Sequence, residues 1–114
     1  MIQITYNRAI PSVTIEGHAG SGEKGHDLVC AAVSILAYTL ASLVESMKHG
    51  TQIHGATVEM NDGGARISCE PIDNYKFPIK LMFDTICAGF DILAQGYPEN
   101  VSFERIDEDK GEPT

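Results

Sequence analysis

The sequence predicts an α+β domain in which two helices cover one face of a mainly antiparallel sheet, in the order ββαββαβ. Two pairs of alternating apolar segments are each joined by a short turn, as in β-hairpins. Each pair is followed by a longer segment with apolar residues at helical spacing. A length of 114 residues, 43% of them hydrophobic, suits one domain with a core of its own.

The first hairpin is predicted between residues 2 and 17. Apolar and polar residues alternate from the start of the chain, and they alternate again after Pro11 and Ser12, which favour a turn. The inward-facing positions are expected to be Ile2, Ile4, Tyr6, Val13 and Ile15.

The first helix is predicted to begin at Asp27, a good N-cap, and to end at Gly50. Its apolar residues cover more of the circumference than a sheet alone can bury, so a second helix or a second subunit should cover another side. The uncharged run over residues 28–44 is at the short limit for a membrane span, and a core helix is the preferred interpretation. The apolar positions are Leu28, Val29, Ala32, Val33, Ile35, Leu36, Leu40, Leu43 and Met47.

The second half of the chain repeats this arrangement. Alternating segments at 56–60 and 65–69 flank the turn sequence "NDGG", and a second helix should begin near Pro78 and run to Gly96. A last strand follows at 101–103. The single domain is predicted to span residues 1–106, and the polar, acidic residues 107–114 to form a flexible tail.

Charge and cysteine content limit the compartment and the partners. A net charge of −8 disfavours direct binding of nucleic acid, whereas a basic protein or peptide would be attracted, if the charge does more than keep the protein soluble. Three cysteines, an odd number, argue against a disulfide framework. With no secretory leader at the start of the sequence, we expect a cytoplasmic protein with reduced thiols and no membrane contact.

The most unusual stretch is "GHAGSGEKGHDLVC", residues 17–30. A phosphate-binding loop requires Lys and then Ser or Thr after a glycine, but here Gly22 is followed by Glu23. A metal site from His18, His26, Cys30 and Cys69 is disfavoured because the chain has no CxxC or HxxxH pair. We therefore predict neither a metal nor another cofactor.

A thiol nucleophile is a better interpretation of this stretch. With Asp27 as N-cap, Cys30 would be the third helical residue, among first-turn amides and at the positive end of the helix dipole, which favours the thiolate. His18 follows the second strand, so the two side chains should share one edge of the sheet as a nucleophile and its base. The alternative is a small core cysteine and an unrelated loop histidine. The Ser34 hydroxyl is expected to bond the Cys30 carbonyl.

Residues 17–34, "GHAGSGEKGHDLVCAAVS", resemble the signature of the ribosomal-processing cysteine protease family of Firmicutes and related bacteria. In that family a histidine after a glycine lies twelve residues before the cysteine of a G-x-D-[IL]-V-C segment. The likeness extends over nearly the whole chain. It implies a homodimeric cytoplasmic endopeptidase that removes a short N-terminal extension from large-subunit ribosomal protein twenty-seven, a basic precursor, after a hydrophobic, aromatic-rich sequence.

The resemblance also implies roles for single residues. Cys30 matches the nucleophile and His18 the general base, while Asp27 and Ser34 match supporting positions. The segment from Gly20 to His26 matches a mobile loop that closes over the substrate, and it departs from the family at Lys24, where relatives have tyrosine. The glycines of this region, expected to let the loop move and approach a substrate, are Gly17, Gly20, Gly22 and Gly25.

Two other functions remain open from sequence. The chain could be a non-catalytic ribosome-assembly or peptide-binding module of the same fold, or a thiol hydrolase that acts on small molecules.

Overall fold

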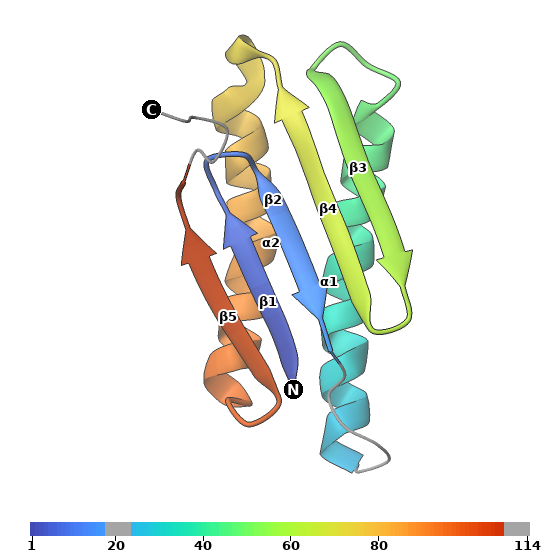
Figure 1. The fold of residues 1–114 in the computed structure, drawn as a ribbon, viewed down its shortest axis with the longest axis vertical. Coiled ribbons are helices and arrows are strands. Elements are labelled where there is room, and N and C mark those ends of the chain that lie inside the picture. Colours follow the sequence, from blue (N-terminus) through green and yellow to red (C-terminus); the bar gives the residue numbers. More distant parts are fainter. Residues whose placement is uncertain (18–23, 109–114) are drawn as a thin grey trace.

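The computed structural model describes residues 1–17 and 24–108, with only the backbone of residues 24–27. Its elements follow the predicted order ββαββαβ, so the α+β fold is confirmed (Figure 1). In chain order they are β1 (Ile2–Asn7), β2 (Ser12–Glu16), α1 (Lys24–Met47), β3 (Ile53–Asn61), β4 (Gly64–Pro71), the short 3₁₀ helix η1 (Asp73–Tyr75), α2 (Lys76–Gly96) and β5 (Val101–Ile106).

The five strands form one sheet in the order β3-β4-β2-β1-β5. All neighbouring strands are antiparallel except β1 and β5, which run parallel. Because β2 pairs with β4, the two hairpins lie side by side, and Glu16 at the end of β2 is opposite Gly64 at the start of β4. This pairing brings the C-terminal end of β2 and the β3–β4 turn together at one end of the sheet.

Both helices lie on the same face of the sheet, α1 behind β3 and β4 and α2 behind β1 and β5 (Figure 1). Alternate residues of the strands point into this layer and are buried, as the period-two pattern predicts. The residues least exposed to solvent include Ile4, Tyr6, Val13, Val29, Leu40, Val44, Ile67, Phe83 and Phe90. The other face of the sheet presents mostly polar residues, such as Thr14, Glu16, Glu59 and Arg66, which is usual for an antiparallel sheet covered on one side.

Helix α1 begins at Lys24, four residues before Leu28, the first helical residue that an N-cap at Asp27 predicts. Asp27 lies inside the helix, so its prediction as the N-cap is wrong. An acidic residue is favourable both at the N-cap and in the first turn, where it complements the helix dipole, so residue type alone does not distinguish these positions. Gly25 continues the helix, since one glycine costs only about 1 kcal/mol relative to alanine.

The apolar part of α1 was expected to be a core helix rather than a membrane span. Residues Leu28–Met47 are long and apolar enough to cross a membrane by length and composition, and a third of the stretch is buried in the fold. Its buried side packs on the sheet through residues such as Val33 and Leu40. That packing supports the core interpretation.

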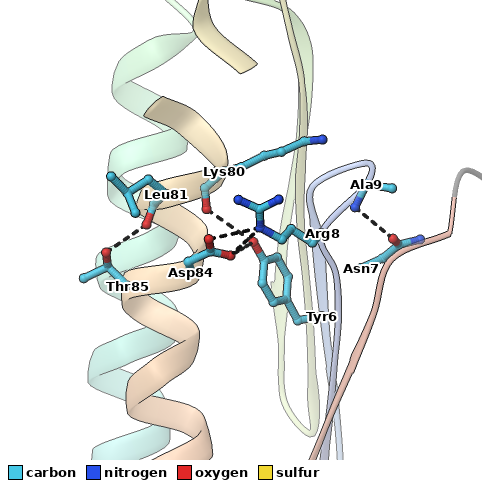
Figure 2. Close-up of polar contacts among 8 residues, drawn as sticks. All are labelled: Tyr6, Asn7, Arg8, Ala9, Lys80, Leu81, Asp84 and Thr85. Carbon is cyan, nitrogen blue, oxygen red and sulfur yellow. Dashed lines mark hydrogen bonds and ion pairs between the residues drawn. The ribbon is translucent and has the colours of Figure 1, made fainter. Parts of the chain in front are cut away.

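A polar cluster ties β1 to α2 (Figure 2). The Tyr6 hydroxyl donates to the Asp84 carboxylate at 2.7 Å, and Arg8 Nε lies 3.0 Å from the same carboxylate. The Tyr6 ring stacks on Phe83, with ring centroids 6.1 Å apart. Burial and the bond to Asp84 raise the pKa of Tyr6. Burial alone would raise the pKa of Asp84, but bonds from Tyr6 and Arg8 and the charges of two arginines lower it below its ordinary value.

Replacing Asp84 with asparagine should lower the free energy of unfolding at neutral pH, because the Arg8 guanidinium loses its charged partner. A carboxylate with a lowered pKa in the folded state stabilises the protein above pH 4 and loses this contribution as the pH falls through that pKa. The difference between the native protein and D84N, measured by urea unfolding, should therefore shrink on acidification. D91N is the control, since Asp91 is exposed and accepts a bond from Gln95 on its own helix. An equal loss of stability in both variants would contradict the prediction.

Candidate active site

A cleft of about 370 Å³ opens between the N-terminal half of α1 and the β3–β4 turn. Cys30, Ser34 and Tyr38 line it from successive turns of α1. Its opposite wall is the turn over residues 61–64, and its floor includes Ile15 from β2. Cys30 is partly buried, and it both packs against the core and lines the cleft.

Gly17, the last described residue before the glycine-rich segment, also lines this cleft. Its φ of +99° lies in the left-handed region, and a Cβ there would stand only 2.2 Å from the backbone oxygen of Met1. Its amide donates to the Gly63 carbonyl at 2.9 Å. The backbone at Gly17 is therefore fixed between the first strand and the β3–β4 turn, and only glycine fits it.

Several predicted site residues cannot be placed. His18, Gly20 and Gly22 lie outside the described residues, and Asp27 and Gly25 are described only as backbone within α1. The pairing of His18 with Cys30 therefore stays a prediction, as do the closing loop and the supporting role of Asp27.

The predicted surroundings of Cys30 are wrong in two respects. Since α1 begins at Lys24, Cys30 is the seventh helical residue, and the amides without intrahelical partners lie about one turn before it. The effect of the helix dipole falls off within the first turn. The structure also records no bond from the Ser34 hydroxyl to the Cys30 carbonyl, although Thr39 and Ser46 make bonds of this kind on the same helix. Ser34 lines the cleft instead.

The other two cysteines are core residues, as expected from the apolar positions that they occupy in the periodic pattern of β4 and α2. Cys69 and Cys87 are 2% and 3% exposed. Burial raises the pKa of the Cys69 thiol to about 11 and that of Cys87 to about 12. Cys30 is thus the most accessible of three free thiols. Among the residues that the structure describes, no three His, Cys, Asp or Glu side chains are grouped so as to hold a metal ion.

The opposite wall of the cleft is not evident from the sequence. The segment "NDGG" predicts only a turn, yet Asn61 and Asp62 bring an amide and a carboxylate to the cleft that contains Cys30. The missing information was the pairing of β2 with β4, which places this turn beside Gly17. Tyr38, two turns after Cys30 on α1, was missed because it follows no local motif.

Comparisons with known proteins agree with this geometry. The family model for cysteine protease Prp matches residues 1–102. The ribosomal processing cysteine protease Prp of Staphylococcus aureus is 24% identical over 102 residues, covering 88% of this chain and 92% of that protein.

Solved structures show the same fold. SMU.848 from Streptococcus mutans is 33% identical with a TM-score of 0.68, over 95% of this chain and 96% of the other. The essential ribosomal processing protease Prp from S. aureus was solved with a covalently linked product peptide. It is 25% identical with a TM-score of 0.65, over 91% of this chain and 96% of the other.

Proposed function

This chain belongs to the cysteine protease Prp family, and on that premise we propose that it is a cytoplasmic cysteine endopeptidase that uses a Cys30–His18 dyad. Its substrate is the precursor of large-subunit ribosomal protein twenty-seven, from which it removes the N-terminal extension during ribosome maturation. The observation that carries the proposal is the cleft in which Cys30 and Gly17, the residue directly before His18, are brought together.

The reaction is acyl transfer in two steps. The Cys30 thiolate attacks the scissile carbonyl carbon, the C–N bond breaks, and the His18 imidazolium gives its proton to the leaving amine. Water then attacks the thioester while His18 accepts its proton, which releases the carboxylate product and restores the thiolate. The first-turn amides of α1 are about one turn from Cys30, so we assign the oxyanion donors to the cleft wall or to the glycine-rich segment.

The charge around the cleft supports a basic substrate. Glu16, Glu59 and Asp62, with Arg66, line a depression of about 240 Å³ that shares the β3–β4 turn with the cleft. The chain as a whole carries a net charge of −8. Opposite charge attracts a ribosomal protein precursor and raises its association rate. The same charge disfavours direct contact with nucleic acid.

The proposal is tested by incubating the purified protein with the unprocessed ribosomal protein of the same organism and recording intact masses. Loss of the N-terminal extension at one peptide bond is the expected result. Binding without any mass change would instead favour the peptide-binding module. Hydrolysis of small thioesters alone would favour the small-molecule hydrolase.

We also propose that the protein is a homodimer in which the partner covers the outer side of α1. Helix α2 flanks α1, where Leu36 packs against Gly89, which has no side chain. Beyond this contact Leu28, Ile35 and Tyr38 remain 59–71% exposed along one stripe of α1. Apolar side chains at such spacing are typical of helix–helix interfaces.

Ile35→Glu should weaken such a dimer at least about 100-fold, because a symmetric interface contains the buried charge twice. Sedimentation velocity over a concentration series measures this change. Thr85→Glu, on the exposed side of α2, is the control and should leave the dissociation constant unchanged. A native protein that sediments as a monomer at every concentration would disprove the proposal.

A further inference from the structure

Strand β3 forms one edge of the sheet. It pairs with β4 on one side, and none of the described strands pairs with its other side. An unpaired edge presents backbone amides and carbonyls that can accept another strand, with alternate residues directed outward. At nine residues β3 is also the longest strand of the described sheet, so it offers an extended series of such groups.

This edge leads into the cleft that contains Cys30. Met60 and Asn61, the last two residues of β3, line the cleft together with Tyr38 of α1. A peptide bound along β3 would therefore reach the cysteine at the end of the strand where β3 turns into β4.

The helix-facing side of β3 is less covered than that of the inner strands. Ala56, Val58 and Met60 pack against the core but are only partly buried. Their counterparts Ile67 on β4 and Ile4 on β1 are at most 1% exposed. The apolar strip along β3 is thus open at its outer border, where side chains of an added strand could complete its burial.

The opposite edge of the sheet lacks these properties. Strand β5 exposes two charged residues in six, Glu104 and Arg105, whereas the longer β3 exposes one, Glu59, and charged side chains at an edge discourage the addition of a strand. The hollow between β5 and α2 contains Asp84 and Asp91 and shares no residue with the Cys30 cleft. β5 therefore serves as an internal control for any effect on β3.

We propose that the substrate peptide binds as an added strand on the outer edge of β3, with its scissile bond at Cys30. Every second side chain of the bound segment lies against Ala56, Val58 and Met60, so the enzyme selects alternating apolar residues on that side of the scissile bond. Backbone hydrogen bonds between the peptide and β3 provide the affinity, and contacts with the apolar strip along β3 provide the specificity, as in other cases of strand addition. This inference rests on the proposed peptidase function.

Hydrogen–deuterium exchange of the full-length Cys30→Ala variant tests the binding mode, since this variant can hold an uncut peptide. The probe is a synthetic peptide that spans the cleavage site of the ribosomal precursor. The amides of residues 53–61 that point away from β4 should exchange about tenfold more slowly with peptide, the effect of one added hydrogen bond, while residues 101–106 should not change. Unchanged exchange of these outward amides, or slow exchange of the same amides before peptide is added, would overturn the proposal.

Peptides N-methylated at single backbone positions provide a second test with the native protein. Methylation at alternate positions on one side of the scissile bond should lower kcat/KM about tenfold per position, and methylation between them should have little effect. Equal losses at successive positions, or none, would contradict strand addition. If the unmethylated peptide is not cut at all, the peptidase function itself is wrong. Cleavage without protection of β3 would keep that function and disprove only the binding mode.

Discussion

Cleavage of the ribosomal precursor should fall at least about 1,000-fold when Cys30 is replaced by alanine, because acyl transfer then has no nucleophile. Cys30 is the one cysteine of the described cleft, whereas Cys87 lies between α2 and β5 on the other side of the molecule. Cys87→Ala is therefore the matched control and should retain cleavage. The initial rate of product formation, followed by mass spectrometry, measures both variants. Equal rates for native protein and C30A would show that the activity resides elsewhere.

Alkylation provides an independent check on the same thiol. Iodoacetamide should label Cys30 at least about 100-fold faster than Cys69 or Cys87 near neutral pH, because only the thiolate reacts. The two core thiols are at most 3% exposed, and burial holds their pKa at about 11 and 12. They should react only on unfolding. Peptide mapping of the labelled protein shows the order in which the three cysteines are alkylated. Simultaneous labelling of all three would contradict this prediction.

Replacing Gly17 with alanine should destabilise the protein strongly. A φ of +99° is strained for any residue with a Cβ, at a cost of about 1–3 kcal/mol. The added methyl would also stand 2.2 Å from the Met1 carbonyl oxygen, so backbone must move. We expect a total loss of about 3 kcal/mol or more, which corresponds to a fall in Tm of about 10 °C or more.

Calorimetry of G17A beside G96A checks this prediction. A Cβ at Gly96 meets nothing within 4 Å and its φ is not positive, so G96A should melt within a few degrees of the native protein. In G17A the cleft should also be distorted, because Gly17 lines it. Cleavage measured well below the melting temperature should therefore fall in G17A and not in G96A. A native-like Tm for G17A would refute the argument.

The sequence predicts the elements of this fold better than the surroundings of Cys30. Alternation and helical spacing are local signals, and they locate β1, β4 and α2 correctly. The start of α1 is different, because Asp27 suits both a cap and a first turn. An error of four residues there moves the free amides one turn away from Cys30.

Pairing between distant segments was not predictable from such local signals. Nothing in β5 itself specifies that it runs parallel to β1, since that choice follows from the route of α2 across the sheet. Likewise the segment at Asn61 and Asp62 became part of the cleft only through the pairing of β2 with β4. Assignment of Cys30 as a candidate nucleophile came from the motif and from the family, and its accessibility is consistent with that role.

The parallel pairing of β1 with β5 has a consequence for the folding kinetics. Ile2 of β1 is opposite Val101 of β5, so two segments from opposite ends of the domain must meet before the sheet is complete. Closing so long a loop is entropically costly, and domains rich in such distant contacts fold slowly, in milliseconds to seconds. Ile2 also lines the cleft beside Cys30. We therefore expect the cleft to be completed late in folding, so that a partly folded chain would not yet cut a peptide.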